Sequence, residues 1–299
     1  MPDTIERTAS AHVSPEELVR RAQALVPMIR DCQEETEAQG RVSEHIFSAI
    51  REQELFKILL PRRYGGFEHG LDTFARVGFE IARGCGSVGW VNSVTAMYHV
   101  FLGMYPEQAQ DEVWGEDTGA VVAASFTPTG TVTAVEGGYS LTGKWMFCSG
   151  VDNCAWTIVG VTIPAEGDEG AEGKAYALVR TSDFEMENNW NVVGLAGTGS
   201  KNVRCEDLFV PEHRLLPIED TMTGKPPGAA VNNGPLYRIP LFAAMSCSLV
   251  APIMGMAQGA IDEFIDLTRA RTTRGAALSK PAGSSATGAT PMQARPISA

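Results

Sequence analysis

The hydrophobic periodicity of the chain changes near Gly119, and this change restricts the fold more than any other feature of the sequence. Before it, apolar residues recur every three or four positions, which is the spacing of an amphipathic helix. After it, short alternating runs are separated by glycine-rich turns, which is typical of β-strands. We therefore predict an α+β chain with an N-terminal helical domain, a middle β-barrel or β-sandwich domain and a further helical segment.

The first region, residues 1–117, is predicted to be the helical domain. Ser14-Pro15-Glu16-Glu17 has the pattern of a capping box with proline at the first helical position. Ser43 is expected to cap a second helix. Further helices are predicted over residues 71–83 and 87–104, and Pro106 is expected to begin a short one.

The middle region, residues 118–216, is predicted to be the β-domain. Gly137-Gly138 is expected to form the turn of a hairpin. The predicted strands are residues 121–126, 131–135, 139–147, 156–163, 176–179, 191–193 and 203–209.

Residues 217–274 are predicted to form a linker and then one long helix over residues 236–274, bent near Pro252. Its uncharged stretch is long enough to suggest a membrane span, but small residues and two prolines favour a buried helix and no membrane partner. Such a helix needs other helices to cover it. Residues 275–299 are rich in Ala, Ser, Gly and Thr without apolar periodicity, and we expect a disordered tail.

Charge and cysteine usage exclude several classes of protein. The net charge of -12 argues against nucleic acid as the main partner. The six cysteines show no CxxC pair and no Cys/His cluster with metal-ligand spacing, so we expect reduced thiols in a cytoplasmic protein and no metal site. The first residues contain no apolar stretch, and no signal peptide is expected. The chain contains no Rossmann fingerprint or Walker loop, so direct binding of NAD or ATP is not expected.

Three segments, taken together and in order, resemble the acyl-CoA dehydrogenase superfamily. They are Glu54-Leu55-Phe56-Lys57-Ile58-Leu59-Leu60-Pro61 with Tyr64-Gly65-Gly66, then Gly143–Gly150, then residues 194–214, beginning Gly194-Leu195-Ala196-Gly197-Thr198-Gly199-Ser200-Lys201. Within that superfamily the flavin-dependent monooxygenase branch is the more similar, because of Gly86-Ser87-Val88-Gly89-Trp90-Val91, the Phe-x-Ser-Gly-x-Asp pattern ending at Asp152, and Gly-Thr-Gly-Ser at 197–200.

This resemblance implies the oxygenase component of a two-component monooxygenase. Similar proteins take reduced FMN or FAD from a separate flavin reductase, react it with O2 to give a C4a-hydroperoxyflavin, and hydroxylate a phenolic or aromatic substrate. It also implies a homo-oligomer, a tetramer in relatives. Two departures are apparent: Ala196 stands where some relatives carry Arg, and relatives continue with the rest of a helical bundle, so we expect a C-terminally truncated chain.

The resemblance also implies a flavin site. The expected cofactor-binding residues are Ser125, Thr127, Trp145, Phe147, Ser149, Gly150, Thr198, Ser200 and Lys201. The Ser149 hydroxyl is expected to bond N5 of the flavin, which accepts a hydrogen bond when oxidised and donates one when reduced. Trp145 and Phe147 are expected to share one strand face beside the ring, with β-core packing as the alternative.

Trp90 and His99 are the expected substrate-binding residues. A neutral His99 imidazole would accept the phenol proton and so act as a catalytic base. Ser149 is the second expected catalytic residue, through its hydrogen bond to N5 of the flavin. The alternative for His99 is an ordinary core histidine. Two other functions stay open: an acyl-CoA dehydrogenase that desaturates thioesters, or an inactive fragment that only binds ligands or partners.

Overall fold

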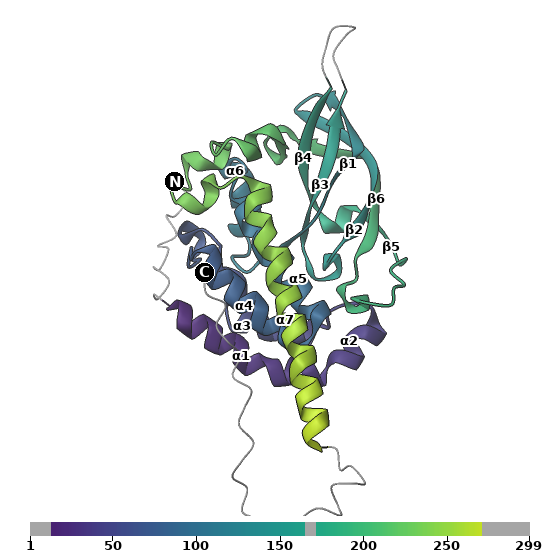
Figure 1. The fold of residues 1–299 in the computed structure, drawn as a ribbon. Coiled ribbons are helices and arrows are strands. Elements are labelled where there is room, and N and C mark those ends of the chain that lie inside the picture. Colours follow the sequence, from purple (N-terminus) through teal and green to yellow (C-terminus); the bar gives the residue numbers. More distant parts are fainter. Residues whose placement is uncertain (1–12, 165–171, 271–299) are drawn as a thin grey trace, which may run out of the picture. The chain divides into compact units, whose positions relative to one another are not determined.

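The N-terminal helices end at Trp114, the strands follow them, and one long helix comes after the strands (Figure 1). The computed structural model describes residues 13–164 and 172–270, so the predicted tail at 275–299 and the last residues of the predicted long helix lie outside it. By its internal contacts the chain divides into two units, Met1–Ala260 and Ile261–Ala299. The helical region, the sheet and the beginning of the last helix all belong to the first unit.

The predicted helices of the first region are confirmed, with small shifts at their ends. Ser14 accepts a hydrogen bond from the Glu17 amide at 3.2 Å and so caps the first helix. Ser43 occupies the N-cap of α3, but its side chain does not bond the helix backbone. The helices are α1 (Pro15–Asp31), α2 (Gln33–Gln39), α3 (Glu44–Glu52), α4 (Leu71–Gly84), α5 (Gly86–Leu102) and α6 (Glu107–Trp114).

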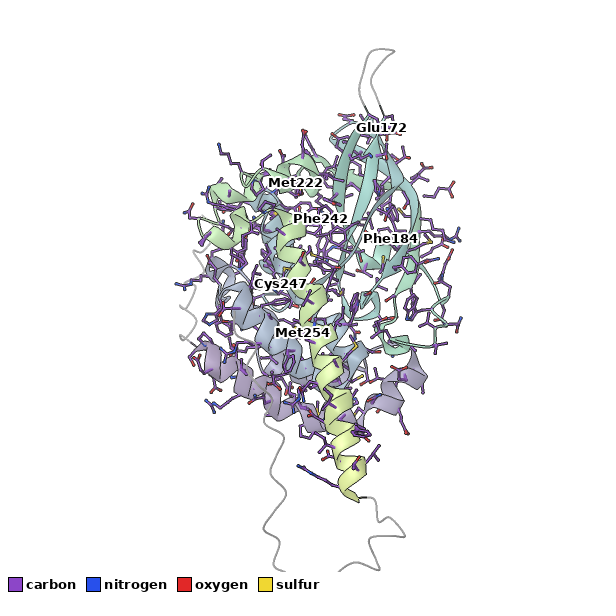
Figure 2. All side chains as sticks on the ribbon, viewed as in Figure 1. Glu172, Phe184, Met222, Phe242, Cys247 and Met254 are labelled. Carbon is purple, nitrogen blue, oxygen red and sulfur yellow. The ribbon has the colours of Figure 1, made fainter. Side chains whose placement is uncertain are left out.

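Helix α5 is the central element of this unit. Every residue from Val91 to Leu102 is buried, which requires neighbours on all sides of the helix. α5 contacts α4 on one side and β1 on another. The aromatic rings of Phe101 and Phe126 stack with 5.4 Å between centroids across the contact with the sheet, and the ring of Phe242 lies 6.1 Å from that of Phe126. Phe242 stands near the start of the last helix (Figure 2).

The β-region forms one sheet of seven strands in the order β5-β6-β2-β1-β3-β4-β7. Strands β1 and β3 pair in parallel, and the other neighbours pair antiparallel. The strands are β1 (Val122–Val135), β2 (Gly138–Cys148), β3 (Trp156–Ile163), β4 (Gly173–Arg180), β5 (Glu185–Glu187), β6 (Lys201–Pro211) and β7 (Leu215–Pro217).

The strand predictions need three corrections. The two strands predicted on either side of Gly130 are one strand, β1, with a register irregularity between Ser125 and Gly130. Residues 191–193 form no strand, and Val193 is fully exposed without sheet pairing. The short strands β5 and β7 were missed, because three residues are too few to show a period.

Nine short 3-10 helices connect these elements in the described residues. They are η1 (Leu55–Ile58), η2 (Arg62–Tyr64), η3 (Val151–Asn153), η4 (Thr181–Asp183), η5 (Ala196–Thr198), η6 (Glu212–Arg214), η7 (Glu219–Met222), η8 (Pro227–Ala230) and η9 (Pro235–Arg238). The last of them replaces the first turn of the predicted long helix, which therefore begins later, at Leu241.

Helix α7 (Leu241–Ala270) runs continuously through Pro252. It packs closely on α4, because a Cβ at Gly255 would lie 2.2 Å from the carbonyl oxygen of Phe79. Among the described residues, α7 is long and apolar enough to cross a membrane by length and composition alone: its most apolar 18 residues have a mean hydropathy of 1.5, and 39% of them are buried. The core helix of a soluble protein has the same properties. The predicted buried helix is thus covered on one face, and residues such as Val250 and Met254 are exposed.

Candidate functional site

The end of β2 forms a tight turn against α5. Phe147 has a φ of 63° and Gly150 a φ of 71°, and the Ser149 amide donates to the Phe147 carbonyl at 2.9 Å. A Cβ at Gly150 would lie 2.7 Å from a methyl group of Val91, so glycine permits the close contact with the helix. A positive φ costs a residue such as phenylalanine about 1 kcal/mol, and strained positions of this kind concentrate at functional sites.

A chain of hydrogen bonds begins at this turn. The Trp90 indole nitrogen donates to the Ser149 hydroxyl at 3.2 Å, and this oxygen lies 2.7 Å from the hydroxyl oxygen of Ser200. The Ser200 oxygen lies 2.7 Å from the Thr198 hydroxyl, which donates to the Leu195 carbonyl at 2.9 Å. α5, the end of β2 and the loop around η5 therefore meet in one polar cluster.

The direction of the protons in this chain follows from its last bond. A carbonyl can only accept, so the proton of Thr198 is used toward Leu195. Either oxygen could be the donor in each of the two hydroxyl pairs; with the Thr198 proton used toward Leu195, the arrangement that keeps both contacts has Ser200 donating to Thr198 and Ser149 donating to Ser200. The oxygen of Ser149 already accepts from Trp90 and retains one free lone pair. Ser149 is half-buried, so a ligand at the turn can reach its oxygen. The Ser149 hydroxyl therefore presents a hydrogen-bond acceptor to that ligand, and not a donor.

A second route joins the same two segments through Trp190. Its indole nitrogen donates to the Leu195 carbonyl at 3.0 Å, and its ring lies edge-on to Phe147 with 6.0 Å between centroids. The Leu195 carbonyl also accepts from the Thr198 amide at 3.1 Å. Leu195 itself has a φ of 58°, so both non-glycine residues at the ends of this route have strained backbones.

Lys201 follows Ser200 in the chain and pairs with Asp152. Its ammonium group lies 2.6 Å from the Asp152 carboxylate, and the side chains of the pair are 15% and 9% exposed. The other Asp152 oxygen is buried, and a Cβ at Gly199 would lie 2.8 Å from it. The ion pair therefore fixes the turn at Gly199. A role for Lys201 toward a flavin phosphate stays a prediction.

Ser125 and Thr127 lie on β1 beside the end of β2. The Ser125 hydroxyl donates to the carbonyl of Met146 at 2.8 Å, and Ser125 is 8% exposed. Thr127 is exposed, and the neighbouring Thr129 hydroxyl donates to the Lys144 carbonyl at 2.7 Å. These bonds attach β1 to the irregular end of β2 and so support the turn that holds Ser149.

The expectation that Trp145 and Phe147 share a strand face is wrong. Trp145 is fully buried, donates to the Gly160 carbonyl at 2.6 Å and packs edge-on against Phe184. Phe147 is 63% exposed. The register shift between Trp145 and Cys148 adds a residue to β2, and such a bulge reverses the faces that follow it. The position of Trp145 agrees with the alternative of core packing.

His99 does not lie with Trp90 and Ser149. Trp90 and His99 are about two and a half turns apart on α5, which places them on opposite sides of the helix. His99 is 1% exposed, donates to the Ala120 carbonyl at 3.2 Å and packs edge-on against Trp114. Burial lowers the pKa of its imidazole to about 4, against the opposing effect of the backbone carbonyl of Ala120. Its surroundings match those of a core histidine.

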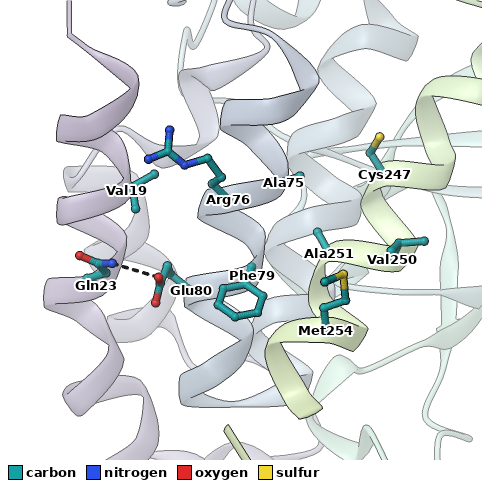
Figure 3. A pocket seen from close by; sticks show the side chains of 10 residues that line it. All are labelled: Val19, Gln23, Ala75, Arg76, Phe79, Glu80, Cys247, Val250, Ala251 and Met254. Atoms are coloured by element: carbon teal, nitrogen blue, oxygen red, sulfur yellow. Dashed lines mark hydrogen bonds between the residues drawn. The ribbon is translucent and has the colours of Figure 1, made fainter. Parts of the chain in front are cut away.

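A separate groove of about 470 Å³ lies between α1, α4 and α7 (Figure 3). Apolar side chains such as Phe79 and Met254 line most of it, and Gln23 donates to the Glu80 carboxylate at 2.9 Å on its wall. None of its lining residues belongs to the predicted site.

The sequence did not single out Trp190, Leu195 or Asp152 as partners of the predicted residues. Asp152 was visible only as the last position of the Phe-x-Ser-Gly-x-Asp pattern. Cys32, Glu35 and His45 also lie together in the structure, although the spacing of cysteines and histidines predicted no such cluster.

Comparisons with known proteins agree with this architecture. Residues 13–117 match the family described as the acyl-CoA dehydrogenase N-terminal domain. A crystal structure of the 3-HSA hydroxylase from Rhodococcus sp. RHA1 has a TM-score of 0.82 and 34% identity, over 87% of this chain and 68% of that one. The helical region, the sheet and the following helix thus form the predicted acyl-CoA dehydrogenase-like fold.

Two curated relatives narrow the class further. The oxygenase subunit HsaA of a flavin-dependent monooxygenase from Rhodococcus jostii is 35% identical over 83% of this chain. The oxygenase component of an FADH2-dependent resorcinol hydroxylase from Rhizobium is 34% identical over 87% of it. The chain belongs to the family of flavin-dependent monooxygenase oxygenase components. It spans 64% and 63% of the length of these two relatives, less than two thirds.

Proposed function

We propose that this protein is the oxygenase component of a two-component flavin-dependent monooxygenase that hydroxylates a phenolic or aromatic substrate. Its partners are a flavin reductase that delivers reduced flavin, O2, and the substrate. The observation that carries the proposal is the one-way hydrogen-bond chain that ends with a free acceptor on Ser149.

The chemistry of this acceptor fits reduced flavin. N5 of the isoalloxazine carries a proton in the reduced cofactor and none in the oxidised one. Ser149 can accept from N5–H, while its own proton remains committed to Ser200. In oxidised flavin, N5 carries a lone pair in place of the proton, and this lone pair would face the lone pair of the Ser149 oxygen without forming a hydrogen bond. The protein is therefore expected to bind reduced flavin more tightly, as an enzyme supplied by a separate reductase requires.

The groups around Ser149 have distinct roles in this proposal. Trp90 holds the Ser149 hydroxyl in place, and Thr198 and Ser200 fix its proton. Phe147 offers an exposed aromatic face beside it, suited to a flat ring. Reduced flavin, when bound, supplies the electrons that activate O2. The residues of this chain bind and orient the cofactor.

An activity measurement tests the proposal. The protein is supplied with reduced flavin by an unrelated flavin reductase and NADH, and phenolic substrates are screened for a hydroxylated product by mass spectrometry with 18O2. One 18O atom is expected in the product. Acyl-CoA thioesters, included as a second series, are expected to stay unchanged. Desaturation of a thioester, or binding of reduced flavin without product from any phenol or other aromatic, would contradict the proposed reaction.

A further inference from the structure

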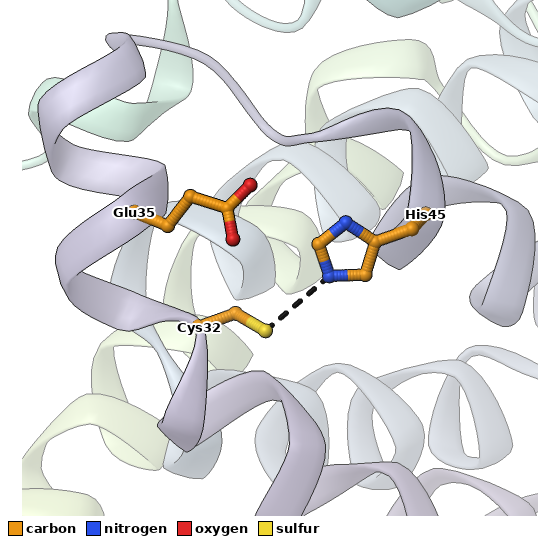
Figure 4. Close-up of side chains that lie close together, drawn as sticks. All are labelled: Cys32, Glu35 and His45. Carbon is orange, nitrogen blue, oxygen red and sulfur yellow. Dashed lines mark hydrogen bonds between the residues drawn. The ribbon is translucent and has the colours of Figure 1, made fainter.

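Three side chains that can bind a metal ion, separate from the site around Ser149, lie together where α1, α2 and α3 follow one another in the chain. Cys32 joins α1 to α2, Glu35 is in the first turn of α2, and His45 is in the first turn of α3. One ligand atom from each lies within 4.8 Å of the others, and the Cys32 sulfur is 3.3 Å from Nε2 of His45 (Figure 4).

The orientation of His45 is fixed by a residue outside this group. Its Nδ1 lies 3.0 Å from the hydroxyl oxygen of Ser43, which is 5% exposed. This contact explains why Ser43 occupies the N-cap of α3 without bonding the helix backbone. With Nδ1–H donating to Ser43, the Nε2 lone pair faces the Cys32 sulfur. Metal-ligating histidines are commonly held in this way by a hydrogen bond at the other ring nitrogen.

The distances suit a small tetrahedral ion. Bonds of about 2.3 Å from zinc to sulfur and about 2.0 Å to nitrogen place these two atoms roughly 3.5 Å apart at a tetrahedral angle. The observed separation of 3.3 Å requires little movement. Glu35 accepts from Gln39 at 2.8 Å through one oxygen, which orients the carboxylate and leaves the second oxygen for a metal.

From this geometry we propose that Cys32, Glu35 and His45 bind one zinc-like divalent transition-metal ion, with water as a fourth ligand. Thiolate and imidazole ligands favour such ions over Mg2+ and Ca2+, which prefer oxygen. Binding replaces the thiol proton of Cys32, which passes to solvent.

The electrostatics of this group support a cation. Glu35 and Asp31 place negative charge near the Cys32 sulfur. A bound cation compensates the same negative charges. The bound metal would also link α2 to its neighbours, and Thr36 of α2 lies against Gly197 in η5, the loop that carries Thr198.

Cobalt substitution tests the proposal. Reduced protein, freed of metal with a chelator and without a histidine tag, is titrated with Co2+ and followed by absorbance. A thiolate-to-cobalt charge-transfer band is expected at one ion per chain, displaced by Zn2+ and unaffected by Mg2+. Cys32→Ser should abolish the band, and Glu35→Gln and His45→Gln should weaken binding by at least about tenfold.

The control variant is Cys247→Ser, which changes another half-buried thiol outside the cluster and should keep the band. Circular dichroism and thermal unfolding without metal establish that every variant is folded. Zn2+ should raise the unfolding temperature of the wild type and leave that of Cys32→Ser unchanged. A wild type without the band, or a Cys32→Ser variant that retains it, overturns the proposal.

Discussion

The hydrogen-bond chain at Ser149 makes a quantitative prediction about flavin discrimination. In Ser149→Ala the acceptor for N5–H is removed. A hydrogen bond between neutral groups at a half-buried site contributes about 1 kcal/mol, so the dissociation constant for reduced flavin should rise about fivefold. Affinity for oxidised flavin should change little, because the Ser149 proton is not available to it in the wild type.

Ser200→Ala should change the other dissociation constant, the one for oxidised flavin. Without Ser200 the proton of Ser149 is no longer committed, and the hydroxyl can rotate to donate to the unprotonated N5 of oxidised flavin. Oxidised flavin should then bind more tightly by a similar factor, while reduced flavin binds nearly as before. The preference for reduced flavin therefore falls in both variants, for different reasons.

Anaerobic fluorescence titration measures the two dissociation constants for each protein. Ser182→Ala, which removes an exposed serine hydroxyl outside the site, serves as the control and should retain the wild-type ratio. If Ser200→Ala leaves the oxidised-to-reduced ratio unchanged, the inferred direction of the protons is wrong. If Ser149→Ala also leaves it unchanged, Ser149 does not contact N5.

Three further predictions follow from the strain, burial and pairing of other residues. At Phe147, where φ is 63°, the Gly variant should exceed the Ala variant in stability by about 1 kcal/mol, the reverse of the order at an ordinary strand position; urea unfolding that finds Ala more stable contradicts the strain. Because burial lowers the folded-state pKa of His99 to about 4, the stability it contributes is fully present above about pH 6.5 and lost as the pH falls toward 4, by about 1.4 kcal/mol per unit. The difference in unfolding free energy between wild type and His99→Gln should show this slope, and parallel pH profiles would refute it. Lys201→Met should destabilise the protein by about 3 kcal/mol, because it leaves the Asp152 carboxylate buried and unpaired. Adding Asp152→Asn to the same chain should restore most of this loss. If urea unfolding shows that Lys201→Met alone is as stable as the wild type, the pair does not hold the turn.

The sequence patterns predicted which hydroxyl groups form the candidate site but not how they are hydrogen-bonded. The Phe-x-Ser-Gly-x-Asp and Gly-Thr-Gly-Ser patterns identified Ser149, Thr198 and Ser200, and the structure brings these three together. The patterns did not contain the order of donors and acceptors. That order depends on the Leu195 carbonyl, which is a backbone group, and on Trp90, which reaches the site from another element.

The sequence by itself determined the local structure. Helices and strands follow from the period of apolar side chains, and α1 begins where Ser14 can cap it, because these effects act over a few residues. The tertiary structure decided which side chains meet. A single bulge in β2 separated Trp145 from Phe147, burial made His99 a core residue, and the turn between α2 and α3 brought His45 to Cys32. Contacts of this kind depend on packing between distant segments, which no local period records.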